Sequence, residues 1–145
     1  MLNSYSILPE YGLLWKRHRG NITRQYLANL NQLVNADKRY CRTMTVFEDL
    51  RGVRILEVDY DYVSIFGREL CDYYGDCPAT VKFGICAPGD LAFGLGRMFQ
   101  TLVSDFGKLD VGVFREVGET LDFLEVPEAA RTRLQDGDQE MGRFF

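Results

Sequence analysis

The sequence has little of what zinc sites, disulfide frameworks and nucleic-acid surfaces require. It has one histidine and four cysteines in 145 residues, and the cysteines form no C-x-x-C pair, so we expect reduced thiols and no structural zinc site. Seventeen basic residues face 21 acidic ones, a net charge of −4, which disfavours binding to nucleic acid through bulk positive charge. No apolar run approaches the roughly 20 residues of a membrane span, and the first residues lack a signal-peptide pattern. We therefore predict a soluble cytoplasmic protein with no membrane span.

The composition is that of one folded domain. Hydrophobic residues make up 46% of the chain and aromatic residues 13%, which is enough apolar material for a core. We predict a domain over residues 1–126 and a C-terminal tail over 127–145. The tail is either disordered, or it forms a helical arm over residues 129–134. In the second case the terminal residues Phe144 and Phe145 dock on another subunit.

Apolar periodicity predicts alternating strands and helices. The expected order is strands at 5–8 and 13–19 joined by a Pro/Gly turn, a helix from 23, a strand at 44–49, a loop at 50–58, a helix at 59–75, a strand at 81–86, a helix at 90–106, a strand at 111–114 and a helix at 120–124. This alternation is typical of a mixed sheet with crossover connections. The predicted fold class is α/β, with a single mixed β-sheet of about five strands and about four helices.

Local signals mark two helix starts. Thr23 can cap the helix that follows it, and Ile22 can pack against Leu27 at its first turn. Asp59 stands at the N-cap position of the next predicted helix. Both helices are therefore expected to begin directly after these residues.

The helix from residue 90 has the strongest apolar pattern. Its predicted inner face consists of Leu91, Leu95, Met98, Phe99, Leu102 and Phe106. Gly94 and Gly96 lower its helix propensity, so we expect a neighbouring strand to approach closely there. Because Gly94-Leu95-Gly96 falls inside a helix, it is no dinucleotide fingerprint, and no cofactor is predicted.

Two stretches are more distinctive: VFEDLRGV at residues 46–53 and APGDLAFGLGRMFQ at 87–100. Together with VFR at 113–115 they resemble the small bacterial domains described as STAS-like or SpoIIAA-like, whose βαβ fold is shared with anti-sigma-factor antagonists. The resemblance covers roughly residues 5–126. It implies a SpoIIAA-like fold and a signalling or regulatory role through protein contacts, and it brings no enzyme signature.

The phosphorylation switch of the anti-sigma-factor antagonists is not carried over. Their regulatory serine stands in a turn at the start of the helix after the central strand, whereas Ser64 lies a full turn inside the predicted helix. Asp59 and Asp61 occupy the turn and would repel an added phosphate, although the acidic turn could mimic a permanently charged state. With Asp49 they could also bind a divalent cation, but helix capping is the favoured role, and no metal is predicted.

The remaining polar candidates give no catalytic site. Glu48 and Asp49 are adjacent in a strand, so they point to opposite faces and cannot act on one atom. One is expected to pair with Arg51 or Arg54 and the other to be solvated. His18 has no Ser or Cys partner nearby and is predicted to be an exposed strand residue.

The cysteines are interpreted as core thiols, with one exception. Cys86 falls in a buried strand and Cys71 on a helix face. Cys77, in a loop, is the one expected to be exposed.

We interpret the protein as a non-enzymatic regulatory or protein-interaction module that binds a protein partner or associates with itself as a homodimer. Phe93, Arg97 and Gln100 are the best candidates for a partner surface, and Asp59 and Asp61 are further candidates. The alternative for the first two is an aromatic ring tucked over the sheet edge with a solvated arginine.

A second hypothesis is a carrier or sensor of a small apolar ligand, a lipid or a nucleotide, held between helices and sheet. Aromatic side chains would either line such a pocket or fill the core. The residues concerned are Trp15, Phe47, Phe66, Tyr73 and Phe83.

Overall fold

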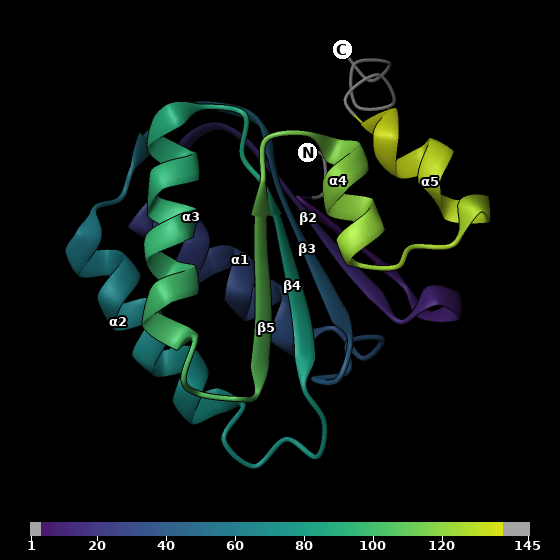
Figure 1. The fold of residues 1–145 in the computed structure, drawn as a ribbon, viewed down its shortest axis with the longest axis horizontal. Helices are drawn as coiled ribbons and strands as arrows, with labels where there is room; N and C mark the ends of the chain where they lie inside the picture. The colour runs from purple at the N-terminus through teal and green to yellow at the C-terminus, as the bar shows by residue number, and fades with distance from the viewer. Residues whose placement is uncertain (1–3, 138–145) are drawn as a thin grey trace.

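A five-stranded sheet separates two layers of helices in the computed structural model, which describes residues 4–137 (Figure 1). In chain order the elements are β1 (Tyr5–Leu8), the 3₁₀ turn η1 (Pro9–Tyr11), β2 (Leu13–Thr23), α1 (Arg24–Ala36), β3 (Thr45–Glu57), α2 (Tyr60–Tyr73), β4 (Val81–Cys86), α3 (Asp90–Val103), β5 (Leu109–Phe114), α4 (Val117–Phe123) and α5 (Glu128–Gln135). Helices α1, α2 and α3 cover one face of the sheet, and α4 and α5 cover the other. The predicted class, α/β with one mixed sheet, is confirmed.

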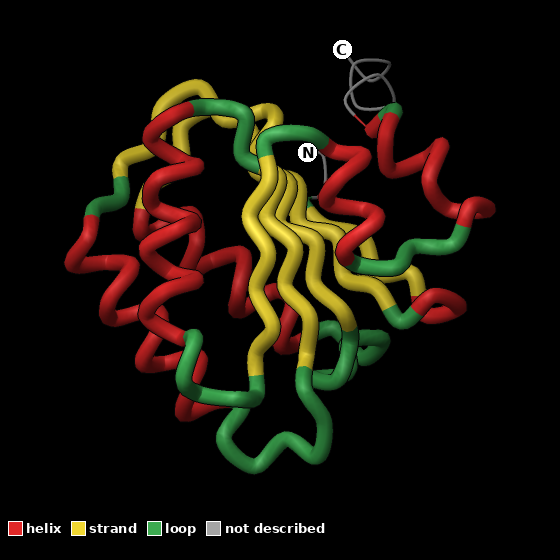
Figure 2. The backbone as a smooth tube through the Cα atoms, viewed as in Figure 1, coloured by secondary structure: helices red, strands yellow, loops and turns green. Residues whose placement is uncertain are grey.

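The strands lie in the sheet in the order in which they occur in the chain (Figure 2). β1 pairs antiparallel with β2, and every later pair is parallel. The opening hairpin forms as predicted because Pro9 begins a tight turn and Gly12 ends it at a φ of 59°, a conformation that glycine adopts without strain. The parallel pairs are joined by helices, as crossover connections require.

Two strands are longer than the sequence pattern indicated. We expected strands at 13–19 and 44–49 and a loop at 50–58, but β2 continues to Thr23 and β3 to Glu57. The two extensions pair with each other, for example Ile22 with Leu56, so each supplies backbone hydrogen bonds that the other lacks. The resulting two-stranded ribbon runs beyond the sheet toward the start of α2 (Figure 2).

Alternation of side chains divides the core between the two faces of the sheet. Leu14, Val46 and Phe83 belong to the core beneath α1–α3. Trp15 and Phe47, one position later in the same strands, belong to the core beneath α4 and α5. Neighbouring residues of β2 and β3 therefore lie in different environments.

Helix α3 is rotated relative to the prediction. Leu91 and Leu102, predicted to be inside, are 59% and 43% exposed, whereas Ala92 and Gly96 are buried. Small residues face the sheet because β5 lies close: a Cβ atom on Gly96 would stand 3.0 Å from Cγ1 of Val113. The expected close approach of a strand is thus confirmed at Gly96, and it is wrong at Gly94, around which a Cβ atom would meet nothing within 4 Å.

The local helix signals hold. The Thr23 hydroxyl accepts a hydrogen bond from the amide of Tyr26 at 3.1 Å, and the Asp59 carboxylate accepts one from the amide of Tyr62 at 3.0 Å. Both residues are N-caps, as predicted.

Residues 128–135 form α5, with Leu134 fully buried against the sheet. Phe144 and Phe145 lie outside the described residues. Of the four free cysteines, Cys86 is buried as expected, but Cys77 is buried and Cys41 exposed, the reverse of the prediction for Cys77. Between residues 4 and 137, no helix has both the length and the apolar character needed to cross a membrane.

Candidate functional site

Three polar side chains of β2 and β3 lie together on the face covered by α1–α3. Lys16 is opposite Glu48 in the strand register, and its Nζ atom lies 3.3 Å from both Glu48 Oε2 and Asn31 Oδ1. His18 Nε2 lies 2.6 Å from Glu48 Oε1. Lys16 and His18 are only 8% and 3% exposed, so this Lys16–Glu48–His18 cluster is a buried polar group in an otherwise apolar core.

The charge state of Glu48 determines the hydrogen-bonding roles of His18. Burial raises the pKa of the Glu48 carboxyl, but Lys16 and the hydrogen bond to His18 together lower it to about 2. An ionised carboxylate only accepts hydrogen bonds, so Nε2 of His18 carries a proton and donates to Glu48. The other ring nitrogen, Nδ1, is buried and has no hydrogen-bond partner among the described residues.

A cavity of about 130 Å³, partly open to solvent, borders this cluster. It lies between the sheet and α1–α3, and the ribbon formed by the ends of β2 and β3 supplies one of its walls. Its lining is mainly apolar, and the apolar residues are Ile22, Leu27, Leu50, Leu56, Val58, Val63, Phe66, Phe83, Ile85, Ala92, Leu95 and Phe99.

A second cavity, of about 270 Å³, adjoins the first. The two share Lys16, Asn31, Phe66 and Phe83 as lining residues. The second has the more polar lining, with residues Asn35, Glu69, Tyr40, Tyr73 and Tyr74. Lys16 therefore stands where an apolar space meets a polar one.

The partner candidates on α3 are engaged within the chain. The Phe93 ring is half-buried, with the Arg115 guanidinium 4.4 Å and the Arg97 guanidinium 6.0 Å from its centroid. Gln100 donates its side-chain amide to the carbonyl oxygen of Val111 at 2.8 Å. Phe93 and Gln100 thus lie along the side of α3 that borders β5.

The acidic candidates lie at the start of α2. Asp59 caps the helix and also forms an exposed ion pair with Arg24 at 2.9 Å. Asp61 is exposed in the first helical turn. No hydrogen bond, ion pair or ring contact within residues 4–137 joins them to Phe93 or Arg97. Over the same residues, no three His, Cys, Asp or Glu side chains are grouped so that they could hold a metal ion.

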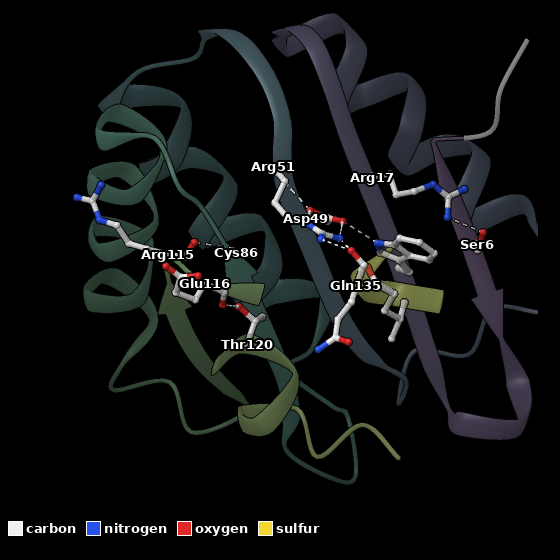
Figure 3. Close-up of polar contacts among 11 residues, drawn as sticks. Ser6, Arg17, Asp49, Arg51, Cys86, Arg115, Glu116, Thr120 and Gln135 are labelled. Atoms are coloured by element: carbon white, nitrogen blue, oxygen red, sulfur yellow. Dashed lines mark hydrogen bonds and ion pairs between the residues drawn. The ribbon is translucent and has the colours of Figure 1, made fainter. Parts of the chain in front are cut away.

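The opposite face carries a second polar cluster, formed by Trp15, Asp49 and Arg51. Asp49 is 3% exposed and accepts hydrogen bonds from Trp15 Nε1 at 3.0 Å and from Arg51 Nη2 at 2.7 Å. Arg51 also donates to the carbonyl oxygens of Leu134 and Gln135, at the end of α5 (Figure 3). The Trp15–Asp49–Arg51 cluster therefore fastens α5 to the sheet.

Glu48 and Asp49 do point to opposite faces, and Asp49 does pair with Arg51, as predicted. The expectation that Glu48 is solvated is wrong, because Lys16 forms an ion pair with it and His18 is hydrogen-bonded to it on the covered face of the sheet. The expectation that His18 is exposed is also wrong. Had the alternation that buries Leu14 been continued along β2, it would have placed both Lys16 and His18 on the core face.

The aromatic residues expected to line a pocket or fill the core do both. Phe66, Tyr73 and Phe83 line the two cavities. Trp15 and Phe47 are fully buried on the other face, where they stack with ring centroids 6.3 Å apart. The side of the sheet beneath α1–α3 therefore combines aromatic walls with open space.

Comparison of the chain with protein-family models, with curated proteins and with solved structures finds no significant match. The resemblance to STAS-like domains therefore stays a prediction from the motifs at residues 46–53 and 87–100.

Proposed function

We propose that the protein is a non-enzymatic binding module for a small, mainly apolar molecule held between the sheet and helices α1–α3. The observation that carries the proposal is the pair of adjoining cavities, of about 130 and 270 Å³, that share a buried lysine in their walls. An apolar cavity of roughly 150 Å³ admits a benzene-sized ligand, so the mainly apolar cavity of about 130 Å³ is close to the size of an aromatic ring.

The chemistry of the polar cluster favours binding over catalysis. Both oxygens of Glu48 are engaged, one by Lys16 and one by His18. A carboxyl with a pKa of about 2 is a weak base at neutral pH, far from the value at which general bases act well. Under the STAS-like resemblance, we propose that occupancy of the site has a regulatory role in the cytoplasm.

Toluene is a suitable first probe because the volume of its ring is close to that of the 130 Å³ cavity. We expect a titration followed by methyl NMR to shift the signals of Ile22, Leu27 and Leu56, which line the cavity, with a dissociation constant in roughly the millimolar range. Methyl signals of Leu121 and Leu134, in the core of the opposite face, serve as internal controls. Equal shifts on both faces, or no saturable shift anywhere, would contradict the proposal.

A cavity-filling variant sharpens this test. Ala92 lines the 130 Å³ cavity, so Ala92→Met extends a flexible side chain into the open space. We expect toluene affinity to fall by roughly tenfold or more while the fold is kept. A native mass spectrum of the protein recovered from its own cells then addresses the natural ligand, because added mass of a few hundred daltons would indicate a bound molecule.

The second candidate function is a protein-interaction module that acts through α3, with self-association as the simplest form. Its support is the surface around Phe93, where two guanidinium groups flank a half-buried ring, and the 59% exposure of Leu91 two residues earlier. Aromatic rings and arginines are enriched in protein interfaces.

Sedimentation analysis tests self-association directly. We expect the double variant Phe93→Ala/Arg97→Ala to weaken a dimer without unfolding the chain. Leu33→Ala, which removes a side chain 60% exposed on α1, is the matched control. A wild-type protein that stays monomeric at all concentrations, or a double variant that dimerises normally, would remove this candidate.

A further inference from the structure

Nδ1 of His18, a residue that lines the cavity of about 130 Å³, has no hydrogen-bond partner among the described residues. His18 is 3% exposed and lines the 130 Å³ cavity. Its Nε2 is bound to Glu48, and its Nδ1 makes no hydrogen bond to any residue that the structure describes. Unpaired buried polar atoms are rare in native proteins, and they call for a specific explanation.

The surroundings of His18 leave the cavity as the place for that partner. The Tyr26 ring lies nearly perpendicular to the imidazole, with 6.0 Å between ring centroids, and its hydroxyl makes no hydrogen bond to Nδ1. Glu48 is already bound through the other nitrogen. A molecule in the cavity is therefore positioned to supply the hydrogen-bond partner that Nδ1 of His18 lacks.

Resting on the proposed function, we infer that the ligand is an alcohol or a phenol whose hydroxyl group hydrogen-bonds to Nδ1 of His18. A hydroxyl both donates and accepts, so it pairs with the lone pair of a neutral imidazole and equally with the N–H of an imidazolium. A pure hydrocarbon pairs with neither form. The apolar body of the ligand occupies the space lined by Leu27, Leu56 and Phe99.

The charge balance of the site selects a neutral polar group. Lys16 and Glu48 already compensate each other at 3.3 Å. A ligand carboxylate would bring a second negative charge next to the partly buried Glu48, and a ligand ammonium would bring a second positive charge next to Lys16. Lys16 uses two of its three N–H donors on Glu48 and Asn31, so a hydroxyl can also accept from this side chain.

The chain contains a single histidine, so ring ¹⁵N signals report His18 without further assignment. We expect phenol to shift the Nδ1 resonance and to leave Nε2 nearly unchanged, because Glu48 continues to hold it. Toluene, which matches phenol in size but lacks the hydroxyl, should bind without moving Nδ1.

The variant His18→Gln isolates the contribution of Nδ1. The glutamine amide nitrogen lies as many bonds from Cα as Nε2 of histidine, so it can still donate to Glu48, whereas nothing replaces Nδ1. We expect the ratio of phenol affinity to toluene affinity to fall roughly three- to tenfold relative to wild type, the usual worth of one buried hydrogen bond.

The outcomes separate this inference from the proposed function. If neither probe binds, both fail. If both bind but Nδ1 does not move and the affinity ratio is unchanged by His18→Gln, the binding function stands and the hydroxyl contact is wrong, with cavity water as the partner of Nδ1. Benzoate that binds as tightly as phenol would overturn the neutral ligand class. Should His18→Gln fail to fold, the ¹⁵N titration of the wild-type protein decides alone.

Discussion

The two faces of the sheet carry buried polar clusters that begin at adjacent residues of the same strands. On one face Lys16, Glu48 and His18 border open space. On the other, Asp49 accepts from Trp15 and Arg51, and Arg51 reaches the last carbonyl groups of α5. The Trp15–Asp49–Arg51 cluster is hydrogen-bonded to α5 of the same chain. The Lys16–Glu48–His18 cluster leaves Nδ1 of His18 without a hydrogen-bond partner in the part of the chain that the structure describes.

This difference separates two uses of buried polarity. A cluster whose donors and acceptors are matched within the chain fixes the position of an element, here α5, and contributes to specificity of packing. A cluster with an unmatched atom at a cavity wall has a binding capacity that the chain itself does not use.

Loss of the Asp49 carboxylate should have the largest effect. Asp49→Ala removes the group that both Trp15 and Arg51 bind, and breaking a buried charge pair costs about 3–5 kcal/mol. Urea denaturation at neutral pH measures the loss. Asp61→Ala, which removes an exposed carboxylate, should leave the midpoint almost unchanged. Equal midpoints for the two variants would show that the Trp15–Asp49–Arg51 cluster does not fasten α5.

Acid should weaken the other cluster in a defined pH range. The pKa of Glu48 falls from 4.5 to about 2 on folding, so the unfolded chain takes up a proton at a higher pH than the folded protein does. Its contribution, about 3 kcal/mol, is fully present above pH 4.5 and is lost as the pH falls toward 2. We expect the stability difference between wild type and Glu48→Gln to shrink over this range. Glu57→Gln, an exposed site on the same strand, is the control, and an unchanged difference would contradict the assignment.

Added volume should be tolerated on one face and not on the other. A Cβ atom on Gly84 would lie 2.7–2.9 Å from three side-chain atoms of buried Leu124, so Gly84→Ala should cost about 1–3 kcal/mol. Ala92→Met extends into the cavity and should change stability by less than about 1 kcal/mol. Thermal unfolding of both variants measures the contrast. A larger loss for Ala92→Met than for Gly84→Ala would mean that the cavity is not open space.

Exposed charge should matter least. Asp59→Asn keeps a side chain that can cap α2 but removes the ion pair with Arg24, and Asp59→Ala removes both. We expect the asparagine variant to unfold at nearly the wild-type temperature and the alanine variant slightly below it. A clear loss in the asparagine variant would show that the exposed pair contributes as the buried ones do.

Features of the fold that depend on short-range interactions were predictable from the sequence. Thr23 and Asp59 cap helices through amides three residues away, so the signal and the structure it forms lie within one turn. The extent of β3 was not predictable in the same way, because Gly52 interrupts the pattern and only Val53 and Ile55 alternate with charged residues as in a strand. Residues 50–57 become a strand only by pairing with the end of β2, more than 30 residues earlier in the chain.

The candidate site shows the same limit more strongly. The alternation of side chains along a strand is enough to place Glu48 and Asp49 on opposite faces of the sheet, and that part of the prediction is confirmed. Nothing local to His18 indicates that its ring is hydrogen-bonded to Glu48, 30 residues away. The Phe93 surface was proposed from helical spacing, which cannot reveal that Arg115 of the β5–α4 connection lies over the ring.

The sequence by itself determined the class of the fold, the number of strands and the starts of two helices, because periodicity and capping act over a few residues. Only the tertiary structure decided which polar groups are buried, which face of α3 meets the sheet and where space is left. Those features depend on residues brought together from distant strands and helices. A cavity is the space that all the surrounding side chains together leave empty.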